Sequence, residues 1–189
     1  MNKRNDRFLC NSSSSQLVIV DIQEKLSATM PEKVINRVIK NTALLAQAAA
    51  AFDVPITMTE QYPRGLGPTL APVAAVASKA RRVEKTCFSC ADSPEFETIG
   101  KEIQRSQIIM VGMEAHVCIL QSALDLQTAG FNVFVVEDAI CSRRLENYEN
   151  GIHRLRHAGV HVTNAESVIF EWLRDSKHEQ FKAVSALLR

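Results

Sequence analysis

The chain has 189 residues, of which 46% are hydrophobic and 23% are charged, and its formal net charge is +1. These proportions are typical of a soluble globular domain with a sizeable core. The near-neutral charge gives no reason to expect nucleic acid or an anionic membrane as a partner, and no apolar run approaches the ~20 residues that span a bilayer.

The five cysteines are an odd number, and no secretory apolar segment stands at the start of the sequence. We therefore expect free thiols in a reducing compartment. The expected location is the cytoplasm, with the mitochondrion or another intracellular compartment left open.

Residues 1–15 combine mixed charges with the serine run Ser12–Ser15, a composition that buries little surface. They are predicted to form a mobile N-terminal arm, and residues 16–189 a single domain. The first apolar run, 17–20, is a predicted strand that ends in Asp21. Ligands bind at the carboxyl ends of parallel strands, so Asp21 would face a site; the alternative is that it only caps the next turn.

Pro31 opens a long predicted helix whose apolar residues recur at helical spacing as far as Phe52. Residues 54–59 are the second predicted strand. The Pro- and Gly-rich segment 60–69 that follows is a loop on the same functional side of the sheet.

Residues 73–80 are helical at most briefly, and the short strand 82–85 ends in Lys85. The loop 86–93 contains the pair Cys87-x-x-Cys90. A zinc ribbon would need a second such pair, and a thioredoxin motif would open a helix after the first strands. We instead expect Cys87 and Phe88 to line a wall beside Lys85. Residues 96–104 are predicted to be helical.

The segment 107–141 has the pattern of a βαβ unit, with predicted strands at 108–112 and 131–136 and a helix between them that Gly130 ends. Cys118 stands at the start of that helix. Free backbone N–H groups and the helix dipole at this position would stabilise a thiolate. The alternative is that Cys118 is a small core residue.

A polar-faced helix at 147–158, a strand at 160–163 and two closing helices complete the chain. Six strands alternating with helices predict a three-layer α/β/α fold with a six-stranded parallel sheet. In that topology Asp21, Lys85 and Cys118 would converge in one crevice. His153 and His157 are four residues apart on one helix but have no acidic partner, so we expect them on a solvated face.

Several motifs, in order and at these spacings, resemble the isochorismatase-like cysteine hydrolases, and within them the eukaryotic isochorismatase-domain-containing proteins. They are Val20-Asp21-Ile22-Gln23, the phrase TEQYPRGLGPT at 59–69, Lys85-Thr86-Cys87-Phe88-Ser89, Gly112-Met113-Glu114-Ala115-His116-Val117-Cys118 and Val136-Glu137-Asp138-Ala139. The resemblance covers nearly the whole chain from Leu17 and implies the Rossmann-like fold of that family.

The resemblance implies a catalytic triad of Asp21, Lys85 and Cys118. It also implies a cis peptide bond between Met113 and Glu114, and an oxyanion hole made by the backbone N–H groups of Glu114 and Cys118. Nicotinamidases of the family use an Asp and histidines for a metal, but this chain has no histidine before His116, so no metal or cofactor is expected. The expected wall of the substrate pocket comprises Glu60, Gln61, Tyr62, Leu66, Phe88, His116 and Ile119.

The predicted function is hydrolysis of a small amide or ureido compound through a thioester acyl-enzyme, with Asp21 as base and then acid. One alternative is hydrolysis of the vinyl ether of isochorismate, although that branch of the family generally lacks the cysteine. Another is an inactive binding or scaffold protein, since Glu114 could crowd or repel an anionic substrate. The resemblance also implies a homo-oligomer, a dimer or higher, and small-molecule substrates rather than nucleic acid or membrane as partners.

Overall fold

A computed structural model describes residues 7–188 and confirms the predicted α/β architecture. Six strands form one sheet in the order β3-β2-β1-β4-β5-β6, and every neighbouring pair is parallel. The strands are β1 Ser15–Val20, β2 Ile56–Gln61, β3 Arg81–Lys85, β4 Gln107–Met113, β5 Asn132–Cys141 and β6 His161–Thr163. The strand order reverses between β1 and β4, which is where sheets of this type bind ligands.

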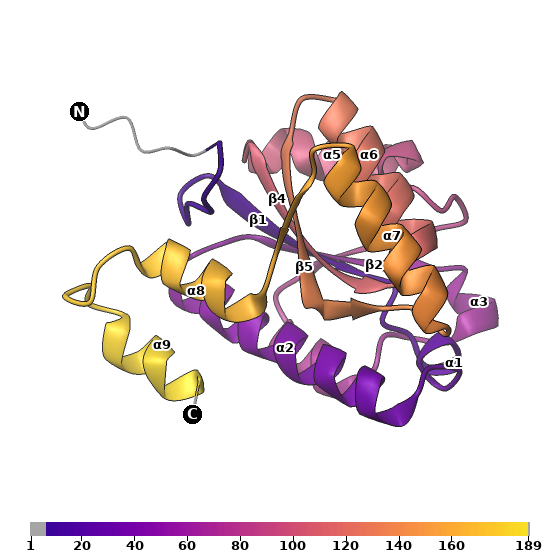
Figure 1. Cartoon of the computed structure of the whole chain (residues 1–189), viewed down its shortest axis with the longest axis horizontal. Coiled ribbons are helices and arrows are strands. Elements are labelled where there is room, and N and C mark those ends of the chain that lie inside the picture. The colour runs from indigo at the N-terminus through magenta and orange to yellow at the C-terminus, as the bar shows by residue number, and fades with distance from the viewer. Residues whose placement is uncertain (1–6, 189) are drawn as a thin grey trace.

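Helices cover both faces of the sheet, with α2 and α8 on one side and α5, α6 and α7 on the other (Figure 1). Their bounds are α1 Glu24–Ser27, α2 Glu32–Ala51, α3 Pro63–Leu66, α4 Ala71–Val76, α5 Pro94–Ile103, α6 Leu120–Thr128, α7 Leu145–His157, α8 Ala165–Leu173 and α9 Phe181–Leu187. Within residues 7–188, none of these helices is both long and apolar enough to cross a bilayer.

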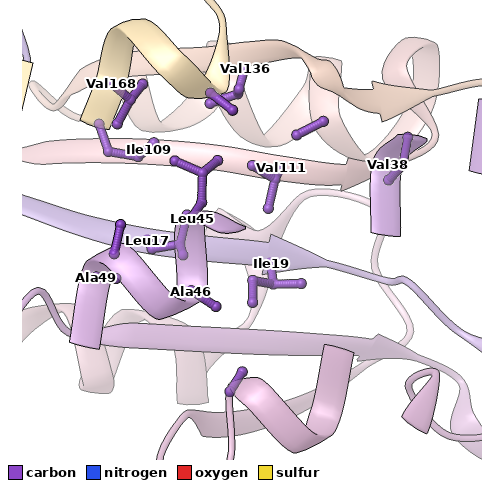
Figure 2. Close-up of a cluster of buried hydrophobic side chains, with 14 of the residues drawn as sticks. Leu17, Ile19, Val38, Leu45, Ala46, Ala49, Ile109, Val111, Val136 and Val168 are labelled. Carbon is purple, nitrogen blue, oxygen red and sulfur yellow. The ribbon is translucent and has the colours of Figure 1, made fainter. Parts of the chain in front are cut away.

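The central strands are buried along their length and mostly apolar because each face of the sheet packs against helices. In β1, Leu17 and Ile19 point toward α2, whereas Val18 and Val20 point toward the α5, α6 and α7 layer. Figure 2 shows the first of these cores, where side chains of β1, β4 and β5 meet those of α2 and α8. All six residues of β1 and all seven of β4 are buried. The continuous apolar runs therefore reflect double-sided burial.

The strand β5 is longer than its apolar pattern predicts, since it runs to Cys141 instead of ending near Val136. Its pairing with β4 shifts in register, with Met110 opposite Val135 and Gly112 opposite Ile140. The extra residues lie in an irregularity of the ladder, and Asp138 within them accepts a hydrogen bond from the backbone N–H of Ala165 at 2.9 Å. In the sequence, an acidic residue after an apolar run suggests a loop, and the contact of Asp138 with the start of α8 cannot be seen. The predicted strand therefore ended too early.

The N-terminal segment differs from the expected mobile arm, of which residues 1–6 lie outside the described part of the chain. Cys10 and Ser15 are fully buried, and β1 already begins at Ser15. The Cys10 N–H donates to the Glu171 carboxylate at 2.6 Å, and the Trp172 indole donates to the Ser15 hydroxyl at 3.1 Å. Composition alone was misleading because the polar groups of this segment find partners on α8.

Candidate active site

The three predicted catalytic residues lie at or after the carboxyl ends of three strands, near the reversal of strand order. Asp21 follows β1, Lys85 is the last residue of β3, and Cys118 lies on a π-helical turn, Ala115–Ile119, that follows β4. The backbone N–H of Asp21 donates to the carbonyl of Thr59 at 3.1 Å, and Asp21 has a φ of 53°. Left-handed backbone is uncommon outside glycine and tends to occur at functional sites, although Asp tolerates it better than most residues.

The Asp21 and Lys85 side chains form a fully buried ion pair, with Lys85 Nζ 2.7 Å from Asp21 Oδ2. The other carboxylate oxygen, Oδ1, accepts a hydrogen bond from the Thr59 hydroxyl at 2.6 Å. Burial by itself would lower the pKa of Lys85, but the neighbouring groups, with the Asp21 carboxylate first, together hold that pKa above its usual value. Lys85 is therefore a permanent cation at neutral pH.

Lys85 Nζ has three further acceptors around it. The Gln61 side-chain oxygen lies at 2.7 Å, and the backbone carbonyls of Cys87 and Phe88 both lie at 3.3 Å. Cys87 and Phe88 thus lie beside Lys85 as expected, although they contact it through their backbone. Cys87 and Cys90 are both free thiols.

Cys118 lies next to this pair, close enough for both charges to act on its thiol. The residue is only 6% exposed. Burial, and then the Asp21 charge, raise the pKa of the Cys118 thiol far above its usual value, while Lys85 opposes the shift. Burial therefore favours the protonated thiol, which agrees with the expectation that Cys118 needs a base.

The turn that carries Cys118 is fixed by its own backbone and by a close neighbour. The Met113–Glu114 peptide bond is cis, and the Glu114 carbonyl accepts hydrogen bonds from the N–H groups of Val117 at 3.0 Å and Ile119 at 3.2 Å. On the other side, Gly151 of α7 packs so closely that an added Cβ would lie 2.9 Å from the Ala115 carbonyl oxygen. The absence of a side chain at this position lets α7 support the turn.

The Glu114 carboxylate is paired with Arg143. Its carboxylate accepts hydrogen bonds from the Arg143 backbone N–H at 3.0 Å and from Arg143 Nε at 3.2 Å. His116 Nδ1 forms a hydrogen bond with the Ser142 hydroxyl, 3.0 Å away, on the same segment. Both side chains therefore hold the segment that carries Cys118 against the end of β5 and the loop after it.

We expect Glu114→Ala to destabilise the folded state by about 1–3 kcal/mol, because it leaves the Arg143 N–H without its charged acceptor. Glu114→Gln keeps an acceptor oxygen and should cost less than half as much. Urea unfolding of both variants measures the difference, with Arg143→Ala as the control that retains the backbone bond. A Glu114→Ala chain at least as stable as the wild type would contradict this role.

The expected wall residues divide into three groups. Tyr62 and Phe88 are 55% and 53% exposed at the rim. Tyr62 also borders a hollow of about 370 Å³ that Lys85 lines. Ile119 is fully buried in the core beneath α6, so its expected place on the wall is wrong: the π-helical turn rotates it inward. The remaining residues, Glu60, Gln61, Leu66 and His116, are buried or half-buried.

Polar contacts account for several of these half-buried positions. The Glu60 carboxylate accepts hydrogen bonds from the Thr69 N–H at 2.8 Å and hydroxyl at 2.7 Å. The Gln61 amide is held by Lys85 and by the Thr86 carbonyl. These side chains fasten the loop after β2.

Sequence reasoning missed Thr59, the third partner of Asp21. The available signal was a hydroxyl near the end of a strand that pairs directly with β1, where Thr59 stands opposite Val20. Among residues 7–188, no group of three or more His, Cys, Asp or Glu side chains is placed to hold a metal ion.

Comparison with known proteins gives a consistent result. The isochorismatase domain model matches residues 15–167. Mouse isochorismatase domain-containing protein 2A is 36% identical over 176 residues, which cover 93% of this chain and 83% of the mouse protein. The structure titled MAR1 ribonuclease from Caenorhabditis elegans has a TM-score of 0.89 and 34% identity, covering 95% of this chain and 92% of that chain. YcaC from Pseudomonas aeruginosa, solved with covalent acrylamide, shares the fold with a TM-score of 0.88 and 24% identity, covering 95% of this chain and 91% of that chain.

Proposed function

The chain belongs to the isochorismatase family of hydrolases, and from this premise we propose that it hydrolyses a small amide or ureido compound with Cys118 as nucleophile. One observation carries the proposal. The buried Asp21 carboxylate lies beside the Cys118 thiol while Lys85 and Thr59 hold its two oxygens. A carboxylate fixed in this way is oriented to remove the thiol proton and has a cation to balance its charge.

In the first half-reaction, the Cys118 sulfur attacks the carbonyl carbon of the amide as the thiol proton passes to Asp21. A bond forms between sulfur and carbon, and the carbonyl oxygen becomes an oxyanion that the backbone N–H groups of Glu114 and Cys118 stabilise. Such donors are typically worth ~2.7–4 kcal/mol each. The C–N bond then breaks, protonated Asp21 gives its proton to the leaving amine, and a thioester remains on Cys118.

The second half-reaction uses the same carboxylate. Asp21 takes a proton from water as the water oxygen attacks the thioester carbon, and the C–S bond breaks. The proton held by Asp21 returns to the sulfur, which restores the Cys118 thiol and releases the acid. Lys85 stays protonated throughout, since its raised pKa keeps it a fixed positive charge.

Acrylamide is a suitable probe because it combines a small amide with an electrophilic double bond, and the YcaC structure carries it covalently. The sulfur would add to the terminal carbon of the double bond, and the thiol proton would end on the adjacent carbon. We expect acrylamide to modify Cys118 of the wild-type chain at neutral pH, detected by intact mass and peptide mapping.

Cys87 is the internal comparison, because it is half-buried whereas the other four cysteines are buried. Cys118→Ala should remove the adduct, and Cys87→Ala should leave it unchanged. If Cys87 is modified faster than Cys118, the nucleophile proposed here is wrong. A positive result would justify screening small amides and ureido compounds for released amine or ammonia.

RNA and isochorismate are the contrasting substrates to assay, because one relative is titled a ribonuclease and the matching domain is named for isochorismatase. Lys85, the cation of this site, is fully buried and already occupied by four acceptors, which disfavours a phosphodiester. RNA cleavage or isochorismate hydrolysis that persists in Cys118→Ala would point to a different site or chemistry. A chain whose cellular phenotype and ligand binding survive that substitution would instead be a binding or scaffold protein.

A further inference from the structure

We infer that Gln61 is a positioning residue that fixes Lys85 against Asp21, instead of a residue of the substrate wall. The inference rests on the proposed function, because it assigns Gln61 a role in the chemistry of the Asp21 and Cys118 pair. Gln61 is the last residue of β2, and β2 lies between the strands that carry Asp21 and Lys85.

The hydrogen bonds of Lys85 show why a neutral acceptor matters. An ammonium group has three hydrogens. Two of them meet short acceptors at 2.7 Å, Asp21 Oδ2 and Gln61 Oε1, and the third faces the carbonyls of Cys87 and Phe88 at 3.3 Å each. With every hydrogen engaged, Lys85 serves as a fixed charge and would have to break a bond to donate to substrate.

The orientation of the Gln61 amide is also determined by its surroundings. Its Nε2 donates to the Thr86 carbonyl at 2.7 Å, which turns Oε1 toward Lys85. Its backbone N–H donates to Gln23 Oε1 at 2.7 Å, and its backbone carbonyl accepts from Gln23 Nε2 at 3.0 Å. Side chain and backbone are therefore both held, and both groups of the amide are occupied by protein atoms.

Gln23 extends this arrangement toward the loop after β2. The same Nε2 that binds Gln61 also donates to the Gly67 carbonyl at 2.7 Å. Gln23 is fully buried and follows Asp21 by two residues. Movement of the loop 62–69 would thus reach Lys85 through Gln23 and Gln61.

A carboxamide is the group that satisfies both neighbours at once. A glutamate at position 61 would present an acceptor to the Thr86 carbonyl, which repels it, and would compete with Asp21 for the ammonium. A methionine keeps the length of the side chain but makes neither hydrogen bond. Both substitutions keep a side chain of similar size at position 61 and change its hydrogen bonds, so an effect on the rate would not come from lost packing.

The test is the rate at which acrylamide modifies Cys118, measured over a range of acrylamide concentrations for the wild type, Gln61→Met and Gln61→Glu. We expect the limiting rate to fall about 10- to 100-fold in both variants, because a misplaced Lys85 misorients Asp21. The half-saturating concentration should change less than about threefold, since the Gln61 oxygen is directed at Lys85 and its nitrogen at Thr86.

Gln16→Met is the matched control. Gln16 is 2% exposed, lies at the other end of β1, and its Nε2 makes a hydrogen bond to Arg105 at 3.4 Å. It should lose comparable stability in urea unfolding while keeping the wild-type rate. Equal losses of rate in Gln16→Met and Gln61→Met would reduce the effect to general destabilisation and overturn the inference.

Two further outcomes are decisive. An unchanged limiting rate with a raised half-saturating concentration would return Gln61 to the substrate wall and overturn the inference alone. A wild-type chain whose Cys118 is not modified would overturn the proposed function, and the inference with it.

Discussion

Asp21→Asn is expected to reduce the rate of acrylamide addition to Cys118 by about 10²–10⁴-fold, the range that general base catalysis usually supplies. The substitution keeps the size and shape of the side chain, but leaves only one of the two oxygens that bind Thr59 and Lys85. It removes the proposed base. Burial, the largest cause of the raised pKa of Cys118, remains in the variant, so the thiol still needs a base.

The same substitution should destabilise the fold. The Lys85 side chain has no exposed surface, and Asp21 is its one charged hydrogen-bond partner among the acceptors within the described structure. Removing one member of a buried ion pair typically costs ~3–5 kcal/mol, because the other charge remains buried. Urea unfolding of Asp21→Asn at neutral pH measures that cost.

The double variant Asp21→Asn, Lys85→Met separates the two effects. It removes the stranded charge, so it should recover much of the lost stability while the addition to Cys118 stays slow. Wild-type stability in the Asp21→Asn single variant would mean that Lys85 does not depend on Asp21. Recovery of the rate in the double variant would mean that Asp21 is not the base.

Gly112→Ala is expected to cost more than about 3 kcal/mol and to prevent the site from assembling. Gly112 lies in β4 opposite Val20 of β1, at the reversal of strand order. An added Cβ would lie 2.0 Å from the Val20 carbonyl oxygen, and the φ of Gly112 is +119°. The backbones of Gly112 and Val20 cannot move apart without breaking the pairing of β1 with β4. That pairing positions Asp21 relative to Cys118.

Two other glycines serve as controls for this substitution. Gly130 has a φ of +94° but nothing within 4 Å of an added Cβ, so Gly130→Ala should cost only the backbone strain, about 1–3 kcal/mol. Gly100 lies inside α5 with open space, and its replacement by alanine should stabilise the chain by about 0.5–1 kcal/mol. Urea unfolding of the three variants tests the order, and a Gly112→Ala chain as stable as Gly130→Ala would refute it.

Much of this protein was readable from local patterns. The uninterrupted apolar runs at 17–20 and 108–112 predicted strands covered on both faces, and the helical spacing after Pro31 predicted α2. Gly130 marks the end of α6 because its φ of +94° suits glycine. The motifs predicted Asp21, Lys85 and Cys118 as the catalytic residues, and the structure brings the three side chains together.

Other features depend on contacts between residues that are far apart in the chain. Asp21 and Lys85 are 64 positions apart, and Thr59 is 38 positions from Asp21. The helix start suggested a site that favours a thiolate, and only the structure shows the burial that raises the pKa of Cys118 instead. Similarly, Gln61 looks like a pocket residue until its amide is found between Lys85 and Thr86.

The division has a simple physical cause. Local sequence determines backbone conformation and the alternation of buried and exposed faces, because these depend on neighbours a few residues away. Protonation states and side-chain hydrogen bonds depend on the dielectric surroundings and on charges that strand pairing brings together. The sequence of this chain therefore determined its elements and their order, and the parallel packing of β1, β2, β3 and β4 decided which side chains lie together at the site.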